Sequence, residues 1–194
     1  MKNAPLQWPF ESSGKPLPAR IRYLCMLVCI LLAASALVEL WIELEGWFSG
    51  EALPNIYAGY RQFYPELDGY SVSGWKVYAA TLFLDLLGFI PYYGALILAA
   101  VIFYRFKCGI FWDTVNITLL KINSFLILFD ACFPSIKDTL QMLSFTAAGK
   151  IILTLSYGIS AEGVRSFIIG LAIYTFSAIL NSAKELADDH KLII

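Results

Sequence analysis

The chain has 194 residues, of which 59% are hydrophobic and only 15% are charged, and its formal net charge is −1. Its mean hydropathy of +0.67 excludes an ordinary water-soluble domain of this length. An isoelectric point near 5.8 and the lack of a basic stripe give no indication of direct nucleic-acid binding. The composition therefore predicts a membrane protein whose main partner is the lipid bilayer.

The first predicted span covers residues 21–44, because residues 23–38 contain no charged side chain. About 20 apolar residues are enough to cross the hydrocarbon core of a bilayer. Residues 34–36 read Ala-Ser-Ala, which resembles a signal-peptidase site, but the apolar sequence continues beyond them and favours a retained helix. Residues 1–20 contain four prolines and are expected to form a short cytoplasmic tail.

The second predicted span covers residues 77–104, and Asp85 is its only charged residue. This segment is longer than a bilayer requires, so it can tilt. Pro91 follows shortly after Gly88 and lacks the backbone N–H of a regular helix. We therefore expect a kink near the middle of this span.

The third and fourth predicted spans cover residues 115–133 and 164–183. The third contains Lys121 and Asp130, and a lysine can extend its ammonium group to the membrane interface. The fourth has no charged residue from position 166 onward. Four spans predict a multi-pass membrane protein. Its expected location is the cell membrane, specifically a bacterial inner membrane.

The segment between these spans, residues 134–163, is expected to lie outside the bilayer. Residues 153–160 alternate between apolar and small or polar side chains, which is the pattern of a half-buried strand. A lone strand cannot cross lipid, since its backbone groups would lack hydrogen-bond partners. Residues 139–145 are expected to form a surface helix, and the alternative is a fifth crossing over 139–161.

The predicted outer loop, residues 45–76, is rich in aromatic residues and glycines. The structural interpretation is that these aromatic residues lie at the membrane interface, where such side chains are common. The functional interpretation is a small outer cap that binds a ligand or a partner peptide. Residues 70–73 also alternate, so short β pairing with 153–160 is geometrically possible.

The topology follows from the distribution of lysine and arginine, which favour the cytoplasmic side. With four spans, nine of the 14 basic residues fall on the side of both termini and five on the other side. The loop 105–114 and the tail 184–194 are then cytoplasmic. The predicted fold is an all-α membrane protein, a four-helix bundle with both termini in the cytoplasm.

No catalytic or metal-binding pattern is present in the sequence. The chain lacks the H-E-x-x-H, P-loop and G-x-S-x-G motifs, and His190 in the charged tail is its only histidine. A metal site would need ligands that this sequence scarcely has. We therefore expect a non-enzymatic protein with no cofactor and no metal.

Four carboxylates are the candidate intramembrane polar residues: Glu39, Glu43, Asp85 and Asp130. An ionisable group at membrane depth is costly, and such groups commonly serve a function. The predicted topology places all four in the outer half of the bilayer, where they could line a common polar cavity that handles protons or cations. The structural interpretation is that three mark helix ends and Asp85 is held by a lysine or a hydroxyl group.

The cytoplasmic loop carries a more specific pattern. Asp113 or Thr114 can cap the third helix. The pattern consists of Gly109, Ile110, Phe111, Asn116, Ile117, Leu120, Lys121 and Ile122. In these residues the loop resembles that of the bacterial four-span membrane proteins of domain-of-unknown-function family 2975. Trp112 replaces a hydroxyl residue of the family pattern, and Asn123 replaces a glycine.

The end of the chain resembles the same family. The matching residues are Lys184, Leu186, Asp188, Asp189, Leu192 and Ile193, while the family's glycine is absent. Family members are often encoded beside a small helix-turn-helix regulator. The resemblance therefore implies a membrane regulator or adaptor that couples to this cytoplasmic transcription factor.

The cytoplasmic docking candidates are Gly109, Phe111, Trp112, Asn116, Leu186, Asp188 and Asp189. The sequence is consistent with two functions. The first is the non-enzymatic regulator or adaptor, and the second is a small transporter or ion-handling subunit that uses an intramembrane carboxylate.

Overall fold

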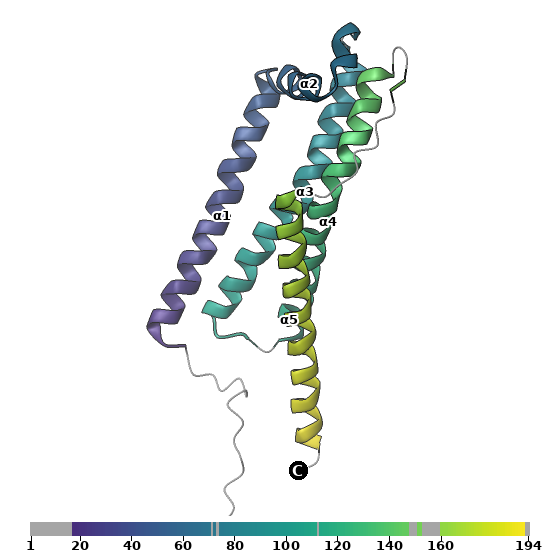
Figure 1. Cartoon of the computed structure of the whole chain (residues 1–194). Helices are drawn as coiled ribbons and strands as arrows, with labels where there is room; N and C mark the ends of the chain where they lie inside the picture. The colour runs from purple at the N-terminus through teal and green to yellow at the C-terminus, as the bar shows by residue number, and fades with distance from the viewer. Residues whose placement is uncertain are drawn as a thin grey trace, which may run out of the picture.

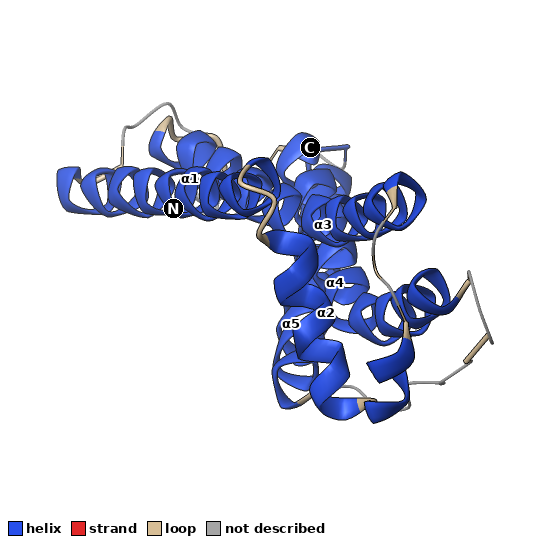
Figure 2. Ribbon diagram, turned by 90° about the horizontal axis from the view of Figure 1, so that it is seen from above, coloured by secondary structure: helices blue, strands red, loops and turns tan. Residues whose placement is uncertain are grey.

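The computed structural model describes residues 17–70, 72, 74–111, 113–147, 151–152 and 160–192. These residues form five α-helices and one short 3₁₀ helix (Figure 1). The elements are α1 (Ala19–Phe48), α2 (Ala52–Phe63), η1 (Pro65–Gly69), α3 (Trp75–Lys107), α4 (Thr114–Thr146) and α5 (Ala161–Leu192). No strand occurs in this part of the chain, as Figure 2 shows from above. The all-helical fold is as predicted.

Four of the helices, α1, α3, α4 and α5, are long and apolar enough to cross a membrane. They contain the four spans predicted from the sequence. Large apolar side chains such as Trp41, Phe83 and Ile168 are exposed on their outer surfaces. Lipid can cover these side chains, and helices satisfy their own backbone hydrogen bonds in lipid. The chain is therefore a multi-pass membrane protein.

The long helices pack in an open row. Helix α1 packs against α3, α3 against α4, and α4 against α5, whereas α1 and α5 share no extensive interface. Gly170 allows α5 to approach α4 closely, because an added Cβ atom would lie 2.9 Å from Cγ of Leu128. The four helices thus form a bundle that is open between its two edges, α1 and α5.

Helix α4 is longer than the third predicted span. The prediction ended at residue 133, but the helix continues through Pro134 to Thr146. Residues 139–145 are therefore the last two turns of α4 and not a separate surface helix. Proline is tolerated inside membrane helices because neighbouring groups satisfy the freed backbone carbonyl. The extension brings Lys137 and Gln141 to face α3.

The segment 45–76 contains more regular structure than the loop that the sequence predicted. Helix α1 continues to Phe48, the chain turns at Gly50, whose φ is +79°, and α2 and η1 follow. Leu67 of η1 is fully buried against Met142 and Phe145 of α4. Residues 71, 73 and 153–159, on which the β pairing was predicted, lie outside the described residues. Tyr70 and Val72 are not in a strand.

The two ends of the helix row differ in structure. The end where α2 lies across the long helices is called the α2 end (Figure 1). The opposite end, where Lys107 and Thr114 are joined by the α3–α4 connection, is called the loop end.

Candidate functional site

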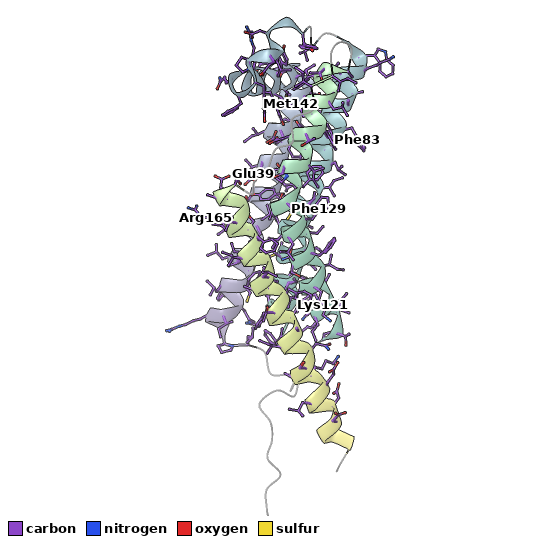
Figure 3. The ribbon with its side chains drawn as sticks, turned by 45° about the vertical axis from the view of Figure 1, so that its right-hand side comes forward. Glu39, Phe83, Lys121, Phe129, Met142 and Arg165 are labelled. Carbon is purple, nitrogen blue, oxygen red and sulfur yellow. The ribbon has the colours of Figure 1, made fainter. Side chains whose placement is uncertain are left out.

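A cavity of about 810 Å³ lies at the α2 end. Its walls come from α1, α2, α3 and α4, and it is partly open to the outside. Figure 3 places Glu39, one of its lining residues, in the half of the molecule nearer α2 and far from Lys121. The cavity is large enough for a small organic molecule.

The cavity lining is strongly acidic. Glu39 and Glu43 come from α1, where they are four positions apart and lie on one face. Asp130 and Asp138 come from α4, and Lys137 is the single basic residue among the described residues of the lining. Four carboxylates therefore face one ammonium group.

Glu39 is flanked by two hydroxyl groups. Ser35 donates a hydrogen bond to Oε1 of Glu39 over 2.7 Å from one turn earlier in α1. The phenol of Tyr92 on α3 lies beside the same carboxylate. Both groups are neutral, and Glu39 forms no ion pair with a described lysine or arginine.

Glu43 and Asp130 have no ion pair with any lysine or arginine in the described part of the chain. Glu43 is exposed to the cavity and Asp130 is half-buried. Glu43 and Asp130 therefore line the cavity as carboxylates without a described basic partner.

Asp85 does not line the cavity. Its side chain is buried, forms an ion pair with Lys137 of α4 and accepts a hydrogen bond from Nε1 of Trp47 over 3.2 Å. Trp47 also packs edge-on against Tyr78, with ring centroids 5.3 Å apart. Asp85 therefore ties α1, α3 and α4 together, which is the structural role that the sequence allowed for it.

A second polar contact joins α3 and α4 one turn beyond this pair. The amide Nε2 of Gln141 donates a hydrogen bond over 2.6 Å to Oγ1 of Thr81, and both side chains are fully buried. Gln141 and Thr81 lie four residues from Lys137 and Asp85 on their respective helices. The two contacts set the antiparallel register of α3 and α4.

Helix α2 closes part of the cavity through Tyr60. The Tyr60 hydroxyl donates a hydrogen bond over 2.6 Å to Oδ1 of Asp138. Burial, followed by this hydrogen bond and the negative charge of Asp138, raises the pKa of Tyr60 well above its usual range. Tyr60 therefore stays protonated and holds α2 against α4.

Seven aromatic side chains complete the cavity walls. They are Tyr60, Phe63, Tyr64, Phe89, Tyr92, Tyr93 and Phe133. The ammonium group of Lys137 lies 5.9 Å from the centroid of the Phe89 ring. This is within the range of a cation–π contact. The cavity thus combines carboxylates with aromatic faces.

The loop end contains a different polar cluster. Asp113 caps α4, accepting a hydrogen bond from the backbone N–H of Val115, as expected for a capping residue, and it forms an ion pair with Arg105. The side chain of Asn116 accepts from Arg105 and donates to the carbonyl groups of Ile110 and Phe111. Every one of these groups is used to fold the turn between α3 and α4.

These contacts change the interpretation of two docking candidates. Asn116 is 1% exposed, so it is a structural residue of the turn and cannot meet a partner at the surface. Gly109 has a φ of +82°, which favours glycine at this turn. Phe111 stacks on Phe106. Trp112 lies outside the described residues, and Leu186, Asp188 and Asp189 lie on the last turns of α5.

The sequence did not identify several residues of the cavity. Lys137 was assigned to a loop because the third span was ended before Pro134. The lining residues of α2 were assigned to the same kind of loop. The spacing of Asn55, Ile56, Gly59, Tyr60 and Phe63 places these lining residues along one side of a helix and could have indicated an amphipathic helix.

A second hollow, of about 360 Å³, lies between α4 and α5. Its lining is almost entirely apolar, and Lys121 is its one charged residue. Its composition suits lipid contact. The acidic cavity is therefore the candidate site.

Comparison of the chain with family models, curated proteins and solved structures gives no match. The resemblance to domain-of-unknown-function family 2975 stays a prediction.

Proposed function

We propose that the chain is a small membrane transporter or cation-handling subunit that takes up a cation in the acidic cavity. The observation that carries this proposal is that Glu39, Glu43 and Asp130 line one cavity without an ion pair to any described lysine or arginine. The charge of Lys137, the one basic lining residue, is matched by Asp85. The cavity therefore has acidic groups in excess.

The excess of carboxylates has a clear physical consequence. An ionised carboxylate in a poorly hydrated environment is unstable unless a cation or a proton neutralises it. Glu39, Glu43 and Asp130 can therefore exchange protons for a bound cation. Exchange of this kind would couple cation movement to a proton gradient.

The helices around the cavity also favour movement. Pro91 lies inside α3 and Pro134 inside α4, and Pro134 lines the cavity. Each proline removes one backbone hydrogen bond from its continuous helix, so the helix can bend there. Helix α2 is held over the cavity by the Tyr60–Asp138 hydrogen bond, so its displacement would open that end.

The test is cation binding by the full-length protein in lipid nanodiscs, measured by calorimetry with Na⁺, K⁺, Mg²⁺ and alkylammonium ions. We expect saturable binding of at least one cation by the wild type and loss of that binding in the double variant Glu43→Gln/Asp130→Asn. The matched control is Glu45→Gln, which changes an exposed glutamate of the same helix that does not line the cavity. Binding by no cation, or undiminished binding by the double variant, would refute the proposal.

Transport is tested in proteoliposomes with the cation that binds. We expect its uptake to follow an outward-directed proton gradient and to stop when the gradient is removed by a proton ionophore. Binding without gradient-dependent uptake would assign the chain to the cation-handling subunit rather than the transporter.

A regulator or adaptor is the second candidate, and the projecting end of α5 supports it. Lys184 contacts Thr114 at the start of α4, and α5 continues for two further turns past this point (Figure 1). Leu186 is 59% exposed on this extension. This helix end could bind the cytoplasmic helix-turn-helix regulator that the family resemblance implies.

The regulator proposal predicts that a chain truncated after Lys184 keeps its fold but no longer copurifies with a small DNA-binding protein in mild detergent. The Leu186→Ala variant should weaken the same association. Equal recovery of the partner by the full-length and truncated chains would contradict it.

A further inference from the structure

We infer that the cavity binds an organic ammonium ion with an apolar body, in preference to an inorganic cation. The inference rests on the proposed function, and it adds the chemical class of the ligand. Three observations on the cavity carry it: its size and aromatic walls, the separation of its carboxylates, and an ammonium group that it already contains.

The size of the cavity suits an organic molecule. A volume of about 810 Å³ lies within the usual range for small-molecule sites and is many times that of a dehydrated inorganic ion. Seven aromatic rings contribute to its walls. An inorganic ion would gain little from such walls, whereas an apolar body would be removed from water by contact with them.

The carboxylates are arranged unfavourably for a metal ion. Among the described residues, no three His, Cys, Asp or Glu side chains lie close enough together to hold one. Mg²⁺ and Ca²⁺ need several oxygen ligands converging at short distances. Glu39, Glu43 and Asp130 instead supply negative charge from two different helices, α1 and α4. An organic cation requires charge of this kind without strict coordination.

Lys137 shows how the cavity accommodates an ammonium group. Its Nζ atom pairs with the carboxylate of Asp85 and lies 5.9 Å from the centre of the Phe89 ring. A carboxylate on one side and an aromatic face on the other is the usual environment for an alkylammonium ion. The Glu39 carboxylate and the neighbouring Tyr92 ring present the same two chemical groups to the cavity.

Gly59 lines the cavity at a position with free space beside it. An added Cβ atom at Gly59 on α2 would meet nothing within 4 Å. A larger side chain at this position can therefore occupy cavity volume without disturbing the packing. Gly59 thus offers a test of location that leaves every carboxylate and every aromatic ring in place.

The first experiment compares butylammonium with n-butanol, K⁺ and Mg²⁺ as ligands of the full-length protein in nanodiscs. We expect butylammonium to bind, n-butanol not to bind because it lacks the charge, and both inorganic ions to bind more weakly. In Tyr92→Leu the affinity for butylammonium should fall roughly threefold to tenfold through loss of the ring. Tyr92→Phe keeps the ring and should bind nearly as the wild type does.

The second experiment locates the site with tetraethylammonium, a bulkier probe. We expect Gly59→Leu to lose tetraethylammonium binding and Gly59→Ala to retain it. Both variants should keep the wild-type melting temperature in the absence of ligand. Equal binding by the two variants would overturn the assignment of the ligand to this cavity.

The outcomes separate the inference from the proposed function. If K⁺ or Mg²⁺ binds as tightly as butylammonium, or if Tyr92→Leu leaves the affinity unchanged, the inference is overturned while cation binding stands. If none of the cations binds, both are overturned. Binding of n-butanol equal to that of butylammonium would also overturn the inference, because the site would then recognise only the apolar body.

Discussion

The two ends of the helix row use polar residues in different ways. At the loop end, Arg105 is paired with Asp113, and the buried Asn116 bonds to Arg105 and to two backbone carbonyl groups. At the α2 end, four carboxylates and one lysine line the cavity, and that lysine is already paired with Asp85. Polar groups within these helices therefore stabilise the fold where they are paired, whereas Glu39, Glu43 and Asp130 form no ion pair with a described basic residue and are available to a ligand.

The largest effect on stability is expected at Asp85. In Asp85→Asn, Lys137 loses its anionic partner in a mostly buried position, and the protein should be destabilised by about 3 kcal/mol. Lys137→Met should be similarly destabilising because it leaves Asp85 uncompensated. The double variant should recover much of the loss, as measured by reversible unfolding in micelles. Additive losses would show that the ion pair does not couple α3 to α4.

A smaller loss is expected at the loop end. Asn116→Ala removes three hydrogen bonds from a buried position and should cost about 2 kcal/mol. Cation binding at the distant cavity should not change. Asn181→Ala, which removes a solvent-exposed hydrogen bond to Glu185, is the control and should change the unfolding free energy by less than about 0.5 kcal/mol. Loss of cation binding in Asn116→Ala would break the distinction between the two ends.

Tyr60→Phe should have a smaller effect, near 1 kcal/mol, because it removes one part-buried hydrogen bond to Asp138. It should also alter the response to alkali. Since the pKa of Tyr60 is raised in the folded state, its contribution is complete below about pH 10 and is lost as the pH rises above that value.

The difference in unfolding free energy between the wild type and Tyr60→Phe should therefore shrink in alkali. Tyr23→Phe, at a highly exposed position, serves as the control and should show no such change. A constant difference across the alkaline range would contradict the role given to Tyr60.

Much of the fold could be predicted from the sequence, because long apolar segments indicate membrane helices directly. For residues 23–38 and 166–183, the absence of charged side chains was enough to predict a membrane-spanning helix. The length of α4 could not be predicted in this way. Pro134 and Lys137 resemble a helix end in sequence, and only the contact of Lys137 with Asp85 explains why the helix continues.

The candidate site was predictable in part. Their positions in apolar segments of the sequence identified Glu39, Glu43, Asp85 and Asp130 as candidate site residues, because carboxylates are rare in membrane helices. It could not separate Asp85, which is paired, from the other three. Pairing depends on the register of α3 and α4, and the aromatic wall depends on the position of α2. Both are consequences of tertiary packing.

The most direct test measures cation binding and unfolding free energy together in Glu43→Gln/Asp130→Asn. These carboxylates lack an ion pair in the described structure, so their removal should change the unfolding free energy by no more than about 0.5 kcal/mol. We expect the double variant to lose butylammonium binding while it keeps this stability, and Glu45→Gln to retain both. Retained binding in the double variant, or a loss of stability as large as that of Asp85→Asn, would contradict this expectation.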